Sequence, residues 1–246
     1  MVALGIWLPC RQPLVLATLV LAACGAVGSG VFALEARPGA AAHVPTIATE
    51  TAAWSVGIML AFCGSLHAIP GDARQGVLAL VWARGMRARD YAFGRTIGLS
   101  AVVGAAVGGV ALVSGICAVS VSSPLLPALR ATFGSLAYCT VFAATISPVA
   151  MAALGVDSRV AGYLSLLAVL VLPEVAAPST STILPSGWNE LTSIPAALTA
   201  IRAGVESPSA YGSHAVRALA LLAALGAVSF AIVRARAARQ HAKLLA

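Results

Sequence analysis

The feature that most constrains this chain is a series of apolar runs, each about 20 residues long and almost free of charged side chains. A helix that crosses about 30 Å of hydrocarbon needs about 20 mostly apolar residues. Charged residues make up 9% of the chain and the mean hydropathy is +0.95, whereas about a quarter of the residues in a soluble domain are charged. The sequence therefore predicts an all-α, polytopic membrane protein.

By this length criterion the chain has about six transmembrane helices and forms a single transmembrane domain over residues 1–246. The predicted spans are 14–34, 51–69, 96–121, 131–156, 160–175 and 214–233. A charged segment, 70–95, separates the second and third spans, and a polar loop, 178–213, precedes the last. Apolar residues in that loop recur at helical spacing, which predicts short interfacial helices: Trp188, Leu191, Ile194, Leu198, Ile201 and Val205.

The basic residues are distributed unevenly between the two sides of this predicted topology. If the amino terminus is cytoplasmic, most of the 15 Lys and Arg residues lie inside, and the outer set is Arg37, Arg130, Arg202 and Arg217. Cytoplasmic loops carry an excess of Lys and Arg, so both termini are predicted to be cytoplasmic in a bacterial-type plasma membrane. The net charge of +7 then reflects span orientation in a lipid bilayer, and no nucleic-acid partner is predicted.

The five cysteines lie in or beside apolar runs and show no metal-binding spacing. We therefore predict neither a disulfide framework nor a metal site. The stretch Leu21–Cys24 matches a bacterial lipobox, but the apolar run continues to Leu34, which favours an uncleaved first span. Whether that stretch is processed is left open by the sequence.

The charged segment 70–95 contains an amphipathic pattern from Asp72 to Met86. Its apolar residues recur at three and four positions, at Val77, Leu78, Val81, Trp82 and Met86. This pattern predicts a helix along the inner face of the membrane. Periodicity alone leaves two interpretations: contact of its arginines with anionic headgroups, or docking of a protein partner.

The order of residues in this segment resembles the first cytoplasmic loop of ABC-2 type transporter permeases. The places of that loop are filled by Asp72, Arg74, Gly76, Val77 to Trp82, Arg89, Tyr91, Gly94 and Arg95. One departure is that the family commonly has a proline shortly before the middle basic residue, where this chain has Arg84-Gly85-Met86-Arg87. A second resemblance is to the family's external gate segment, on Ile194 to Arg202, with Pro195 before a short helix that ends in Arg202.

The resemblance implies a six-span permease subunit that is driven by a separate ATPase subunit. The chain has no GxxxxGK[ST] loop, so it is predicted to be a transport subunit without an ATPase site of its own or any cofactor; the partner ATPase would bind ATP and Mg. Residues 72–86 would form the ATPase-coupling helix, including Leu78, Val81 and Trp82. Two permease copies, identical or different, would form an export pathway. The haem-exporter permease of cytochrome c maturation is a variant within this class.

Other polar residues are candidates with a simpler alternative. His67 and Glu174 are candidate pathway residues, but the sequence favours a hydrogen-bonded interfacial histidine for His67 and simple interfacial exposure for Glu174. Tyr138, Thr140 and Ser147 are placed to form hydrogen bonds across helices. Gly104 and Gly108 have the GxxxG spacing that permits close helix packing.

Two other classes of membrane protein, ion-coupled carriers or scaffolds and intramembrane proteases, fit the sequence less well. An ion-coupled secondary transporter or membrane scaffold is the main alternative, but ion-coupled carriers usually place charges at mid-membrane, and the predicted spans have none. An intramembrane protease is less favoured, because no histidine lies mid-span and no Gly-x-Ser-x-Gly motif is present. Nothing in the sequence identifies the substrate.

Overall fold

The computed structural model describes residues 6, 10, 12–66, 68–156, 158–180 and 192–245. In these ranges the chain is helical almost throughout and contains no strand. Among the described residues, six helical stretches are long and apolar enough to cross a membrane. The predicted all-α, multi-pass architecture is therefore confirmed.

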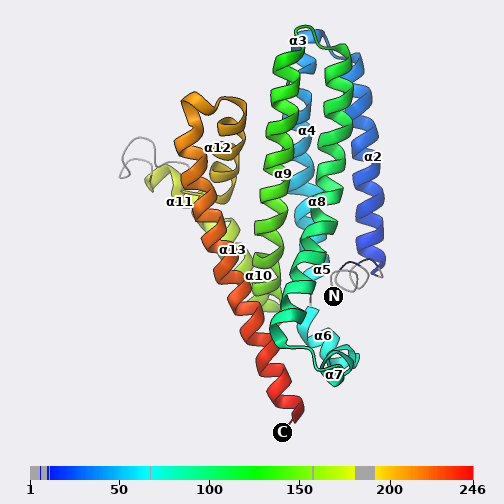
Figure 1. The fold of residues 1–246 in the computed structure, drawn as a ribbon, viewed down its shortest axis with the longest axis vertical. Helices are drawn as coiled ribbons and strands as arrows, with labels where there is room; N and C mark the ends of the chain where they lie inside the picture. The colour runs from blue at the N-terminus through cyan, green and yellow to red at the C-terminus, as the bar shows by residue number, and fades with distance from the viewer. Residues whose placement is uncertain are drawn as a thin grey trace.

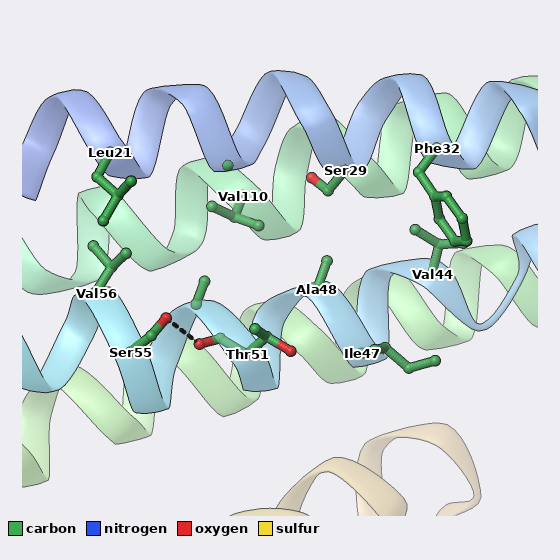
Figure 2. A pocket seen from close by; sticks show the side chains of 12 residues that line it. Leu21, Ser29, Phe32, Val44, Ile47, Ala48, Thr51, Ser55, Val56 and Val110 are labelled. Atoms are coloured by element: carbon green, nitrogen blue, oxygen red, sulfur yellow. Dashed lines mark hydrogen bonds between the residues drawn. The ribbon is translucent and has the colours of Figure 1, made fainter.

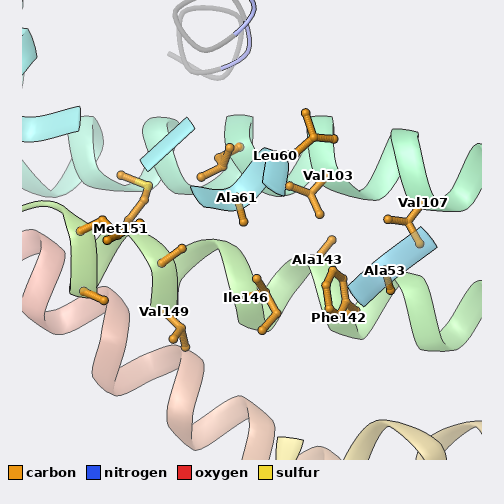
Figure 3. Close-up of a cluster of buried hydrophobic side chains, with 14 of the residues drawn as sticks. Ala53, Leu60, Ala61, Val103, Val107, Phe142, Ala143, Ile146, Val149 and Met151 are labelled. Atoms are coloured by element: carbon orange, nitrogen blue, oxygen red, sulfur yellow. The ribbon is translucent and has the colours of Figure 1, made fainter. Parts of the chain in front are cut away.

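The longest helices form one bundle (Figure 1). Helix α8 (Ala88–Val121) packs against α2 (Pro13–Glu35), α4 (Val44–Ala52) and α9 (Leu125–Leu154). The core between them holds buried side chains such as Leu60, Val103 and Phe142 (Figure 3). A Cβ atom at Gly104 would lie 3.4 Å from the Ala143 side chain, and one at Gly108 would lie 3.4 Å from Cys139 Sγ. Both glycines thus face α9 and permit the predicted close packing.

The second span begins much earlier than predicted. Its helices follow one another with short interruptions: α3 (Pro38–Ala41), α4, a π-helical segment η1 (Ala53–Gly57), α5 (Ile58–Ser65) and α6 (Ala68–Arg74). Glu50 lies just before the predicted start of this span at residue 51, but the structure places it inside α4. Proline fits the first turn of a helix, and Pro45 occupies that position in α4.

Several other span boundaries also move outward. Helix α8 begins at Ala88 rather than 96, α9 begins at Leu125, and α13 (Pro208–Leu245) extends past both predicted ends of the sixth span. The fifth span divides at Val171 into α10 (Arg159–Leu170) and α11 (Leu172–Thr180). Charged residues mark where a helix leaves the hydrocarbon, and the helix continues beyond them because its backbone bonds remain satisfied.

The single helix predicted from Asp72 to Met86 is wrong. The structure has α6, then α7 (Val77–Ala83), with Gly76 between them at φ 72°. Helix α7 ends in a Schellman motif: the Gly85 amide donates to the Trp82 carbonyl (2.9 Å) and the Met86 amide to the Val81 carbonyl (3.4 Å). Gly85 has φ 70°, a conformation that glycine adopts without steric cost.

The loop 178–213 contains one well-formed amphipathic helix among the described residues, α12 (Ile194–Glu206). The Ser193 hydroxyl accepts from the Ala196 amide (3.2 Å) and caps its start. Its buried face includes Ile194, Leu198 and Ile201, as the spacing predicted. Trp188 and Leu191 lie outside the described residues.

The two ends of the bundle differ in what they present (Figure 1). The start of α2, the end of α13, α6 and α7 lie in the lower half of the view, and α3 lies at the opposite end. Helix α12 packs against α13 and α9 in the upper half. The predicted residues on α6 and α7 and those on α12 therefore lie in opposite halves of the bundle.

Candidate functional site

Helix α7 turns an apolar side chain away from the molecule. Leu78 and Val81 are buried, at 0% and 6% exposed, and Trp82 and Val77 are half-buried. Leu80 is 67% exposed, and the exposed residues near it are Ala79, Ala83 and Arg84. The exposed surface of α7 is therefore centred on Leu80, while Leu78 and Val81 pack inward.

A buried cluster of three polar side chains joins α6 to α8. The Tyr91 hydroxyl donates to Asp72 Oδ2 (2.6 Å), and Arg95 Nη2 donates to Asp72 Oδ1 (3.4 Å). Arg95 Nε lies 3.1 Å from Asp72 Oδ2, within ion-pair distance. The side chains of Arg95 and Asp72 are 5% and 6% exposed. We call this set the Asp72 cluster.

The Asp72 cluster fixes α6 at one position on α8. A buried charge that loses its partner is strongly destabilising, so the two helices cannot separate here without a large penalty. Arg95 Nη1 is buried and makes no hydrogen bond within the described residues, which leaves Asp72 as the principal partner of this guanidinium. All three residues belong to the segment predicted from the sequence, but no pattern in the sequence predicts that they are in contact.

The remaining residues predicted for this segment have smaller roles in the structure. Arg74 and Arg89 are exposed, and Arg89 Nε lies 3.7 Å from Asp90 Oδ1 in a solvent-exposed pair of little energetic weight. Gly76 supplies the left-handed residue before α7, and Gly94 is buried in α8. His67 lies outside the described residues.

A second polar cluster lies on α12. Arg202 Nη1 lies 2.6 Å from Glu50 Oε1 on α4, and Arg202 Nε lies 3.8 Å from Glu206 Oε1 one turn along α12. The Arg202 guanidinium carbon also stands 5.8 Å from the ring centroid of Tyr138 on α9, a cation–π distance. We call this set the Arg202 cluster. Arg202 was predicted from the sequence, whereas Glu50 was not, because it lies outside the predicted second span, 51–69.

The aromatic side of the Arg202 cluster continues into the core. Trp54 Nε1 donates to the Tyr138 hydroxyl (2.8 Å), and Trp54 packs edge-on against Phe142. The prediction that Tyr138 forms a hydrogen bond across helices is therefore confirmed. Thr140 instead bonds to the Leu136 carbonyl of its own helix. Pro195 sits half-buried in the first turn of α12.

The structure has an apolar cavity that was not predicted from the sequence. It has a volume of about 450 Å³ and lies between α2 and α4 over α8, with apolar lining residues such as Leu21, Val56 and Val110 (Figure 2). Ser29 and Ser55 donate to carbonyls of their own helices, so the cavity offers little polar chemistry. Glu174 is exposed on α11 and does not line it.

Within the described residues, no group of three or more His, Cys, Asp or Glu side chains is arranged to hold a metal ion. Comparison of the chain with protein-family models, curated proteins and solved structures found no match.

Proposed function

We propose that this chain is the membrane-spanning permease subunit of an ABC-2 type transporter, an exporter that works with a separate ATPase subunit and a second permease copy. Both termini would be cytoplasmic. One observation carries the proposal: a short helix, α7, stands at one end of the bundle with Leu80 exposed, directly after a helix that the Asp72 cluster joins to the third span. This arrangement suits a docking helix that transmits a movement of the ATPase to the transmembrane helices.

The proposed transmission follows from these contacts. Nucleotide-driven closure of the ATPase would displace α7. Because Leu78 and Val81 are buried and the Asp72 cluster joins α6 to α8, the displaced helix would carry α8 with it. Helix α13 also contacts both α6 and α7, so the sixth span would follow. The ATP and Mg would be bound by the partner.

The Arg202 cluster would act at the opposite, external end. Helix α12 rests on α9 and α13 and is joined to α4 through Arg202 and Glu50. Because Arg202 also lies near Glu206, it keeps one carboxylate when α4 moves away. We infer that α12 closes the pathway on this side and that the Arg202–Glu50 pair opens during export.

Co-purification tests the docking surface. Leu80→Glu should reduce the amount of a P-loop ATPase that co-purifies with the tagged chain by about tenfold or more, because a charge would be desolvated at the interface. Val205→Glu, at an exposed position on α12, is the matched control and should retain the ATPase. Equal recovery with both variants, each folded, would remove α7 as the docking helix.

An ion-coupled carrier is the second candidate, and the structure offers one observation in its favour. The second span contains a π-helical segment, η1, which begins three residues after the charged Glu50. Carriers use such irregular helices and charges at their ion sites. Absence of any ATPase from the purified wild-type complex, together with ion-gradient-driven proton movement that Glu50→Gln abolishes, would favour this reading over the permease.

A further inference from the structure

A polar cavity lies where α6, the end of α9 and the carboxyl-terminal part of α13 meet. It has a volume of about 190 Å³, well above the ~15 Å³ that a single water requires. Its lining includes Ile69, Pro70, Gly155, Arg236, Arg239 and Gln240. Neither the docking surface nor the Arg202 cluster includes any of these residues.

One arginine of this cavity is held in place by the backbone. Arg236 Nη1 donates to the carbonyl oxygen of Ala152, near the end of α9, where carbonyl groups lack partners within the helix. A guanidinium has five N–H groups, so several donors of Arg236 remain for a ligand. Its position is thus set in advance, which lowers the entropy lost when a ligand binds.

Among the described residues, no carboxylate balances the charge of the two arginines at the cavity. Neither Arg236 nor Arg239 forms an ion pair with a carboxylate in the part of the chain that the structure describes. From Arg234 to the end of the sequence there are three arginines and Lys243 but no acidic side chain. Two arginines one turn apart at a cavity therefore offer a binding site for an anion that accepts several hydrogen bonds.

The location favours a phosphate group at the membrane surface. The apolar run of α13 ends at Val233, and the arginines follow directly, in the half of the molecule that holds α6 and α7 (Figure 1). Basic pockets between transmembrane helices bind lipid phosphates at this depth. We propose that the cavity is a phosphate-binding site, filled by the headgroup of an anionic lipid or by free phosphate.

Occupation of this site would join α6 to α13 through the ligand. Ile69 and Pro70 lie just before Asp72 on α6, the helix that precedes α7. A bound phosphate would therefore stabilise the packing of α6 against the sixth span. This inference needs no ATPase partner, so it stands or falls independently of the proposed function.

Ligand-dependent thermal unfolding of the purified full chain in neutral detergent tests the site. The ligands are phosphatidylglycerol, phosphatidylcholine and inorganic phosphate, and the decisive variant is Arg239→Gln, whose exposed side chain makes no hydrogen bond to the fold within the described residues. Arg234→Gln, exposed on the same helix outside the cavity, is the control. Phosphatidylglycerol should raise the unfolding midpoint of the wild type and of the control. Arg239→Gln should need about tenfold more of it, because one charge-assisted hydrogen bond is lost.

Comparison of the three ligands distinguishes a lipid headgroup from free phosphate as the occupant of the site. A midpoint shift with phosphatidylglycerol alone assigns the site to a lipid headgroup, and a shift with inorganic phosphate as well assigns it to the phosphate group itself. Equal shifts with phosphatidylglycerol and phosphatidylcholine, or equal weakening in Arg234→Gln and Arg239→Gln, would overturn the proposal, since either result reflects a general property of the lipid or of the basic tail.

Discussion

Two arginine–carboxylate pairs hold the two ends of this molecule, and they differ in how completely they are sealed. Arg95 and Asp72 are 5% and 6% exposed, whereas Arg202 and Glu50 are 13% and 37% exposed. Arg95 has one carboxylate and shares it with the Tyr91 hydroxyl. Arg202 has Glu50, Glu206 and the Tyr138 ring around it.

This difference separates a fixed joint from a contact that is able to open. Breaking the Asp72 pair leaves a buried charge without its partner, which is costly. Breaking the Glu50 pair leaves Arg202 with a second carboxylate and some access to solvent. If the proposed function holds, α6 and α8 should move as one body and α4 and α12 should separate during the transport cycle.

The largest effect is expected from Asp72→Ala. Removing the carboxylate leaves Arg95 buried without its partner, and the free energy of unfolding should fall by about 3–5 kcal/mol. Reversible unfolding in mixed micelles measures this loss. The double variant Asp72→Leu with Arg95→Met removes both charges and should recover most of the stability; an unchanged single variant would contradict the fixed joint.

Tyr91→Phe should have the next largest effect. It removes a buried hydrogen bond to a charged carboxylate, which is worth about 1.5–3 kcal/mol. The same unfolding assay applies. Tyr163→Phe is the matched control: Tyr163 is 40% exposed and its ring stacks on Phe62, so loss of its hydroxyl should change stability by less than about 0.5 kcal/mol. Equal losses in the two variants would argue against a role for the Tyr91 hydroxyl.

Glu50→Gln should cost less than either change at the Asp72 cluster. Glu50 is partly solvated and Arg202 keeps Glu206, so the expected loss of unfolding free energy is about 1 kcal/mol. A loss as large as that of Asp72→Ala would abolish the contrast between the two pairs. Trypsin cleavage near α12 provides a second readout and should accelerate in this variant.

The smallest effect is expected from Glu206→Gln. Its carboxylate lies 3.8 Å from Arg202 Nε in an i,i+4 pair, which contributes about 0.3–0.5 kcal/mol. In the Glu50→Gln background the same change should cost more, because Glu206 is then the remaining carboxylate of the Arg202 cluster. Simple additivity of the two losses would mean that Arg202 does not exchange partners.

The sequence predicted the class of fold because membrane hydrocarbon imposes a length and an apolar composition on each span. Span ends were less predictable. A charged residue in the sequence predicts the end of a transmembrane helix, but Arg95 and Glu50 both lie inside helices. In each case a partner from another segment compensates for burial of the charge. Such partners are distant in sequence, and no local pattern indicates them.

The sequence predicted the residues of the Asp72 cluster but not their contacts with one another. Asp72, Tyr91 and Arg95 were named from a resemblance to a loop, but their mutual contact depends on how α6 packs on α8. Gly76 and Gly85 carried a usable signal for helix ends, which the amphipathic pattern across Asp72 to Met86 obscured. Leu80 does not belong to that pattern. Its exposure could not be predicted, because it depends on the tertiary position of α7.

Photo-crosslinking at Leu80 tests the central claim most directly. A benzophenone amino acid replaces Leu80 in the chain expressed in its own membrane, and the crosslinked partner is identified by peptide mass spectrometry. Leu126, 55% exposed at the start of α9 at the opposite end, is the control position. The permease proposal predicts a crosslink to a P-loop ATPase from position 80 and none from position 126. Crosslinks from position 80 to lipid alone, with the ATPase absent at both positions, would contradict it.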